Sequence, residues 1–134
     1  LERGFERWDW CRAALPGGGT AVLYDIHART GPGPTLALRF APDGAVAALD
    51  PPPPAALPAT RIWRIPRGIL ADAGSVPAVR ETLEDTPFYA RSVVSSRLWG
   101  EPVTAFHESL SLTRFARPWV QMLLPFRMPR SLRR

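Results

Sequence analysis

The chain has 134 residues, the length of one globular domain and too short for two independent hydrophobic cores. Apolar residues make up 46% and charged residues 22%, a composition that excludes an intrinsically disordered protein. Cys11 is the only cysteine, so no internal disulfide can form. The longest nearly apolar run, residues 118–126, is far shorter than the ~18–20 residues of a transmembrane helix.

The basic charge is concentrated at the C-terminal end. All 17 basic residues are arginine; residues 1–113 carry eleven of them against twelve acidic residues, whereas residues 114–134 carry six and no acid. A basic face across the whole fold, as nucleic-acid binding requires, is therefore not predicted, and no nucleic-acid partner is expected. The tail, with apolar Trp119 and Leu123 among its arginines, is consistent with contact to an anionic membrane surface or with a solvated basic end.

Short apolar or alternating runs between turn residues fill the first half of the chain. The glycines at 17–19 can supply the positive φ angles of a hairpin turn, and Pro42-Asp43-Gly44 predicts a second turn. Pro51–Pro54 is expected to be a loop, because proline donates no hydrogen bond to a β ladder. The strands predicted here are residues 5–15, 20–29, 35–41 and 45–49.

The second half continues the strand pattern and then changes period. Strands are predicted at 60–65, 88–99 and 103–112, while residues 66–86 show no clear pattern. The i, i+4, i+7, i+8 spacing of apolar residues from Phe115 to Leu123 predicts a short helix that begins near Pro118 and ends at Pro125. The fold class predicted is all-β, an antiparallel sandwich or barrel with a short C-terminal helix.

The common catalytic motifs are absent. The sequence has no phosphate-binding loop, no dinucleotide-binding Gly-x-Gly-x-x-Gly before a helix, no Gly-x-Ser-x-Gly elbow and no His-Glu-x-x-His zinc motif. With two histidines and one cysteine, a transition-metal site would need carboxylate ligands, and no metal is predicted.

The densest group of polar residues on an apolar strand is Tyr24-Asp25-Ile26-His27. Strand alternation places Asp25 and His27 on one face and Tyr24 on the other. If the face of Asp25 lines a cavity, desolvation raises the pKa of this carboxyl and makes it a possible general acid. If that face meets water, the pair is an ordinary solvated strand surface.

Aromatic residues suggest a possible ligand surface. Trp8 and Trp10 flank Asp9 and share one strand face, as expected either of sheet packing or of the wall of an apolar pocket. His107, beside Glu108 on a late strand, is interpreted as a structural histidine.

Five stretches carry a resemblance to the bacterial carotenoid 1,2-hydratases, the hydroxyneurosporene synthase family. They are residues 5–13, 87–92, 107–110, 114–115 and 124–130, the last reading Leu-Pro-Phe-Arg-Met-Pro-Arg. The resemblance implies a lipocalin-like β fold. It also implies that residues 1–134 form one β domain, the C-terminal half of a two-domain protein, with a helix and basic tail at 114–134.

The same resemblance implies a hydro-lyase without cofactor that adds water across the terminal 1,2 double bond of an acyclic carotenoid such as neurosporene or lycopene. The resemblance implies Asp25 as proton donor and Tyr24 as the residue that orients it or stabilises the cation. A His-x-Trp element of the catalytic set is expected upstream of this chain. A β-bulge or strand end would be needed to bring Tyr24 and Asp25 to one cavity. His27 is expected to hold the water, and Trp8 and Trp10 to line an apolar channel.

The implied location is cytoplasmic, with peripheral contact to a membrane through the basic tail, and this fragment alone is expected to be inactive. The alternative is a non-catalytic lipocalin-like carrier of an apolar isoprenoid, which needs the cavity but no acid in it. Exposure of Asp25 to solvent, far from Tyr24, would favour the carrier.

Overall fold

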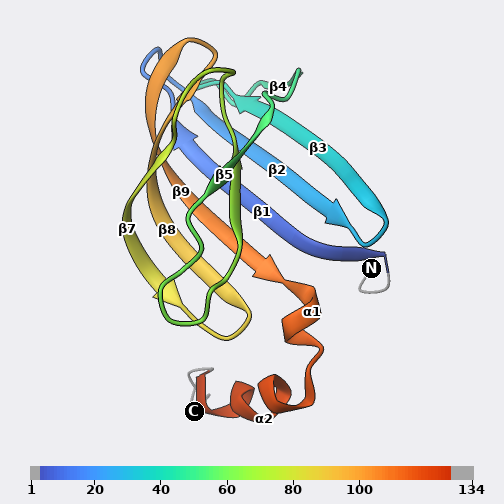
Figure 1. The fold of residues 1–134 in the computed structure, drawn as a ribbon. Coiled ribbons are helices and arrows are strands. Elements are labelled where there is room, and N and C mark those ends of the chain that lie inside the picture. Colours follow the sequence, from blue (N-terminus) through green and yellow to red (C-terminus); the bar gives the residue numbers. More distant parts are fainter. Residues whose placement is uncertain (1–3, 128–134) are drawn as a thin grey trace, which may run out of the picture.

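A seven-stranded antiparallel sheet forms most of the molecule (Figure 1). The computed structural model describes residues 4–127, with the backbone alone for 125–127. The order of strands in the sheet is β4-β3-β2-β1-β9-β8-β7, so the first and last strands of the chain are neighbours at its centre. Its strands are β1 (Phe5–Ala14), β2 (Thr20–Ala28), β3 (Gly31–Phe40), β4 (Val46–Leu49), β7 (Ala78–Asp85), β8 (Tyr89–Leu98) and β9 (Glu101–Ser111).

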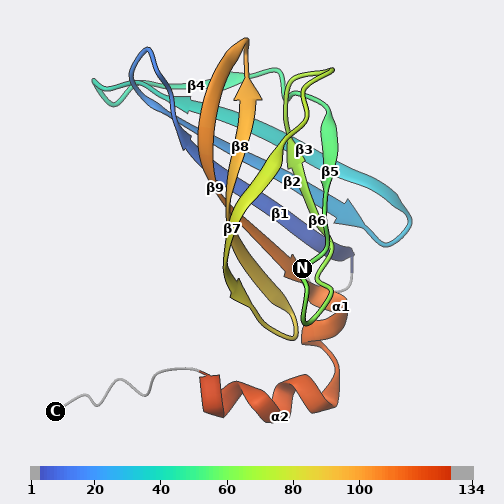
Figure 2. The same cartoon turned by 60° about the vertical axis from the view of Figure 1, so that its left-hand side comes forward.

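A two-stranded sheet, β5 (Pro54–Leu57) and β6 (Arg67–Leu70), packs against one face of the large sheet. Figures 1 and 2 show this pair crossing in front of β1, β2 and β9, while the large sheet stays open, with β4 and β7 at its edges. The all-β antiparallel class with a short C-terminal helix is confirmed, in an open rather than a closed form.

The face beneath β6 is divided into an apolar and a polar part. Strand alternation directs small residues such as Ala13, Ala21 and Ala105 inward, and Ile69 and Leu70 of β6 pack against them. Further along the same face the buried side chains become polar. The apolar part is the hydrophobic core, and the polar part forms the site described below.

The turns at 17–19 and 42–44 lie where the sequence predicts them, whereas β3 begins at Gly31, four residues before the predicted strand. Gly18 and Gly19 both adopt positive φ, of 95° and 87°, and a Cβ at Gly19 would lie 2.5 Å from the carbonyl oxygen of Phe40. The β8–β9 turn is formed by Trp99 and Gly100, whose backbone N–H groups both donate to the carboxylate of Asp72 at 2.7 Å.

The prediction of a strand at residues 60–65 is wrong, because these residues form a tight loop. The backbone N–H of Thr60 donates to the carbonyl of Ile65 and its hydroxyl accepts from Ile65 N–H, while Arg64 adopts a φ of 53°. The N–H groups of Ile62 and Trp63 donate to the carboxylate of Asp85, 23 and 22 residues away respectively. These long-range bonds replace the sheet partners that a strand would need.

Other parts of the secondary structure also differ from the prediction. Pro54, expected in a loop, begins β5, since a two-stranded sheet leaves one side of each strand free of ladder bonds. The unassigned residues 66–86 supply β6 and β7. The predicted helix is two helices, α1 (Leu112–Phe115) and α2 (Pro118–Arg127); α2 begins at Pro118 as predicted but continues through Pro125 instead of ending there.

Residues 128–134, most of the predicted basic tail, lie outside the described residues. Among the residues that are described, no helix has the length and apolar character needed to cross a membrane.

Candidate functional site

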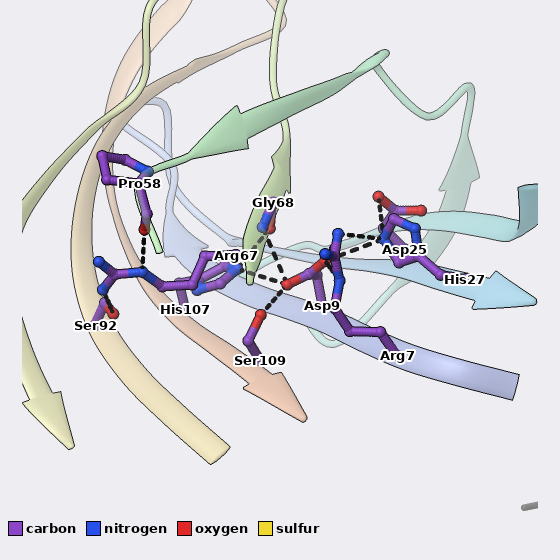
Figure 3. Close-up of polar contacts among 10 residues, drawn as sticks. All are labelled: Arg7, Asp9, Asp25, His27, Pro58, Arg67, Gly68, Ser92, His107 and Ser109. Atoms are coloured by element: carbon purple, nitrogen blue, oxygen red, sulfur yellow. Dashed lines mark hydrogen bonds and ion pairs between the residues drawn. The ribbon is translucent and has the colours of Figure 1, made fainter. Parts of the chain in front are cut away.

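A buried carboxylate on the central strand organises the polar part of the inner face (Figure 3). Asp9 is 2% exposed and lies mid-way along β1, between β2 and β9. It accepts hydrogen bonds from Gly68 N–H of β6 at 3.2 Å, from the Ser109 hydroxyl of β9 and from Nε of Arg7 at 3.1 Å. Three strands far apart in sequence therefore meet at this side chain.

His27 joins Asp9 to a second carboxyl group. Its Nε2 atom lies 3.1 Å from Oδ2 of Asp9 and 3.2 Å from Oδ2 of Asp25. Nη2 of Arg7 is also 3.1 Å from this nitrogen. Because both carboxyl groups face Nε2, we assign the ring hydrogen to that nitrogen, donating to Asp9. We refer to Arg7, Asp9, Asp25 and His27 as the carboxylate site.

A β-bulge shapes the edge of this site. In the β2–β3 ladder Asp25 pairs with Thr35 and His27 with Pro32, so Ile26 faces two residues, Gly33 and Pro34. A Cβ at Gly33 would lie 1.9 Å from the carbonyl oxygen of Ile26, so only glycine allows this approach. The predicted shared orientation of Asp25 and His27 is present, and Gly33 permits the local geometry.

The two carboxyl groups have opposite pKa shifts. Burial opposes ionisation of Asp9, but hydrogen bonds with His107 and His27, the charge of Arg7 and the hydroxyl of Ser109 outweigh it and hold the pKa of Asp9 well below its ordinary value. For Asp25, burial is the largest effect and raises its pKa above the ordinary value, with the positive charge of His27 opposing the rise.

The imidazole between them is also shifted. The pKa of His27 is raised, chiefly by its hydrogen bond to Asp9, against the opposing effects of burial and of Arg7. The arrangement thus favours an ionised Asp9, a protonated His27 and an Asp25 that keeps its proton to higher pH than an ordinary aspartate.

His107 supports the site from β9. It is fully buried, its Nε2 donates to the carbonyl of Gly68 at 2.6 Å, and the same nitrogen is 3.5 Å from Oδ1 of Asp9. Its Nδ1 has no hydrogen-bond partner among the described residues. These contacts agree with the structural interpretation of His107 made from sequence, and they help to fix Asp9 and β6.

Two pockets open beside the carboxylate site. One, of about 430 Å³, lies between Asp25 and His27 on one side and the largely apolar segment Pro54–Leu57 on the other. The second, of about 260 Å³, runs from Arg7 and His27 to Arg114 and Arg117 near the helices. Asp25 is 6% exposed, so its environment is that of a cavity wall rather than of open solvent.

The aromatic candidates lie on the other side of the sheet. Trp8, Trp10 and Tyr24 line a separate pocket of about 380 Å³ with Tyr89 and Leu110, and the rings of Trp10 and Tyr24 are 6.3 Å apart. The bulge follows Asp25 and does not turn Tyr24 inward. The structure therefore brings Asp25 and His27 together but does not place Tyr24, Trp8 or Trp10 among the residues that line the 430 Å³ pocket beside Asp25.

The carboxylate site also contains a possible metal-ligand set. One atom each of Asp9, Asp25 and His27 lies within 4.8 Å of the others, the carboxylate-assisted arrangement that the sequence would require. The guanidinium of Arg7, however, contacts both Asp9 Oδ2 and His27 Nε2 at 3.1 Å and already supplies positive charge there. The residues present fit a network of ion pairs between side chains better than a metal centre.

The sequence did not lead to a prediction of Arg7, Asp9, Ser109 or Gly68 as members of the site. Alternation alone places Asp9 on the inward face with Cys11 and Ala13, and this information was present in the sequence. Gly68 could not have been found, because it reaches Asp9 only through the packing of β6 on the large sheet.

The sequence comparisons give a consistent result. The family described as carotenoid hydratase CrtC matches residues 1–134. Over 130 residues, 97% of this chain, the sequence is 59% identical to an acyclic carotenoid 1,2-hydratase of Thiocapsa roseopersicina and 44% identical to one of Rubrivivax gelatinosus. The chain spans 32% of the length of each of these relatives.

A solved structure shares the fold. The crystal structure of a putative AttH from Nitrosomonas europaea superposes with a TM-score of 0.55 at 15% identity, covering 83% of this chain and 40% of the other. At this identity the likeness concerns the fold alone.

Proposed function

The chain belongs to the carotenoid hydratase CrtC family, and from this premise we propose that it forms part of an enzyme that hydrates the terminal 1,2 double bond of acyclic carotenoids. The observation that carries the proposal is Asp25, a carboxyl group of raised pKa in the wall of a 430 Å³ pocket. The activity belongs to the whole protein, of which this chain matches about a third in its relatives.

The reaction needs a strong acid near an apolar substrate. Asp25 in its neutral form gives its proton to C2 of the alkene, leaving a tertiary carbocation at C1; water adds at C1 and loses a proton, which restores the acid. Protonation of an unactivated alkene demands that the carboxyl be neutral and shielded from water, and burial supplies both conditions.

Asp9 and His27 support Asp25 in its proposed role as the general acid. The ionised Asp9 places negative charge near Asp25, which disfavours ionisation of Asp25 and adds to the effect of burial. Nε2 of His27 contacts both carboxyl groups, and the His27 residue lines both pockets, so we assign to His27 the positioning of Asp25 and of the attacking water.

Tyr24 receives a different role from the one first expected. Since Tyr24 lies on the opposite face from Asp25, it cannot orient that carboxyl or stabilise a cation formed beside it within this chain. We propose that Tyr24, Trp8 and Trp10 contact an apolar chain at the outer pocket instead.

The outer aromatic pocket also favours a second candidate function, a carrier that binds an apolar isoprenoid without converting it. A carrier requires an apolar pocket but has no use for a buried acid in another cavity. The state of Asp25 therefore separates the two candidates.

The test is the variant Asp25→Asn in the full-length protein, assayed with neurosporene or lycopene. Asn keeps the shape of the side chain but carries no transferable acidic proton, and loss of a general acid lowers turnover by ~10²–10⁴-fold. Asp50→Asn, at an exposed position, is the matched control and should retain activity. Normal turnover by Asp25→Asn would remove the acid assignment, and carotenoid binding without hydration by the unaltered protein would favour the carrier.

A further inference from the structure

An exposed apolar surface lies at the helical end of the molecule, away from both the core and the carboxylate site. It combines the 60–65 loop with the outer face of α2. Ile62 is 76% exposed and Met122 is 73% exposed. We call this surface the α2 patch; its members are the exposed apolar residues Ile62, Trp63, Trp119, Met122 and Leu123.

The patch is continuous across two segments distant in sequence. The rings of Trp63 and Trp119 stack at 5.9 Å with an interplanar angle of 25°. Ile62 adjoins Trp63 in the loop, and Met122 and Leu123 follow Trp119 at i+3 and i+4, on the same side of α2. Figure 2 shows α2 lying beyond the end of the sheet, just below the loop between β5 and β6.

The loop is held in the shape that exposes these side chains. The guanidinium of Arg114 donates to the carbonyl oxygens of Trp63 and Arg64, the latter at 3.1 Å. The carboxylate of Asp85 accepts from the N–H groups of Ile62 and Trp63 at 2.9 and 3.3 Å. Two charged side chains from other elements thus fix the backbone while Ile62 stays in solvent.

Helix α2 anchors the other half of the patch. Val120 is buried and attaches the helix to the domain, whereas Trp119, Met122 and Leu123 face outward. An amphipathic helix normally turns its apolar side to the core; here apolar residues occupy the outward side as well.

The charge around the patch is positive. Arg61, Arg64 and Arg117 are exposed beside it, and the carboxylate of Asp85, at the end of β7, is engaged by the backbone N–H groups of Ile62 and Trp63. Residues 114–134 contain six arginines and no acidic residue. Exposed tryptophans and aliphatic side chains with a basic surround are the composition of surfaces that rest in the interface of an anionic bilayer.

We propose that the α2 patch seats this protein on an anionic lipid bilayer. The exposed arginines beside the patch are complementary in charge to anionic headgroups, and this complementarity favours a bilayer over a protein partner. In this orientation the 260 Å³ pocket, lined by Arg114 and Arg117 at one end and His27 at the other, lies between the bilayer and the carboxylate site. The proposal stands independently of the proposed function, since its test reads lipid binding alone.

The test is sedimentation of the full-length protein with vesicles of phosphatidylcholine alone or mixed equally with phosphatidylglycerol. Binding is expected to the anionic vesicles and to weaken with salt. The double variant Ile62→Ser with Met122→Ser, which keeps the Trp63–Trp119 stack, should weaken binding at least tenfold, as expected from the loss of two large apolar side chains. Val76→Ser, at a 90% exposed valine in another loop, is the matched control and should bind as the unaltered protein does.

A second measurement examines the charges. Arg61→Gln with Arg117→Gln should lower affinity for the anionic vesicles and leave any residual binding to phosphatidylcholine unchanged. Absence of binding to anionic vesicles, or equal binding by the Ser double variant, overturns the proposal. A lipid-free dimer that the Ser double variant dissociates would assign the patch to a protein interface instead.

Discussion

Replacing Asp9 with asparagine should destabilise the protein substantially although the shapes of the side chains match. Asp9 is buried and is the acceptor for Gly68, Ser109, Arg7 and His27. An asparagine has one acceptor oxygen and no charge, so Arg7 and His27 lose their main counter-charge. Breaking a buried ion pair costs ~3–5 kcal/mol, and we take about 3 kcal/mol because Arg7 and His27 are partly exposed.

The measurement is urea and thermal unfolding of the unaltered chain and of Asp9→Asn, followed by tryptophan fluorescence and circular dichroism. For a domain of this size, about 3 kcal/mol corresponds to a fall in Tm on the order of 10 °C. Asp50→Asn at an exposed position should change the free energy of unfolding by less than ~0.5 kcal/mol.

The effect also has a defined pH dependence. The pKa of Asp9 is lower in the folded than in the unfolded chain, so its stabilisation is present above the ordinary aspartate pKa of ~3.9 and is lost as pH falls below that value. The difference in stability between the unaltered chain and Asp9→Asn should therefore shrink in acid. Equal stability of the two proteins at pH 7 would refute the role given to Asp9.

Two further predictions concern the bulge at Gly33 and the histidine of the carboxylate site. Gly33→Ala should lower the free energy of unfolding by ~3 kcal/mol or more, because its Cβ would lie 1.9 Å from the carbonyl oxygen of Ile26. The control Gly17→Ala meets no atom within 4 Å and should be nearly neutral. Equal effects of the two variants would contradict the role given to Gly33 in the bulge. His27 should titrate above its ordinary pKa of ~6.5 when its ring protons are followed by NMR, with a stabilising contribution that is complete below that pH and lost as pH rises through the folded-state pKa. In Asp9→Asn the pKa of His27 should fall; an unchanged value would show that Asp9 is not the cause.

Strand alternation was a reliable guide for four strands of the large sheet, whereas it placed the start of β3 four residues too late. It located β1, β2, β8 and β9 closely and predicted that Asp25 and His27 share a face. It failed at Thr60–Ile65, where the pattern looks like a strand but Asp85 and Arg114 bind the backbone of a loop. Such bonds come from residues more than 20 positions away, so a local pattern contains no trace of them.

The candidate site was predictable in part for the same reason. The inward direction of Asp9 follows from its position two residues before Cys11, but its importance depends on Gly68 and Ser109, which arrive through packing and strand order. The separation of Tyr24 from Asp25 follows from alternation, and the bulge near Ile26 acts one residue too late to reverse it.

The pairing of the first strand with the last has a consequence for how the molecule assembles. Asp9 and Ser109 are 100 residues apart, so the hydrogen bond between them cannot form during synthesis until Ser109 has left the ribosome. Contacts of such long range make folding slow, because much chain entropy is lost before they form. Asp9 receives its bonds from Gly68 and Ser109 only after β6 and β9 have packed against β1. Asp9 therefore becomes buried late in folding, after the strands from both ends of the domain have paired.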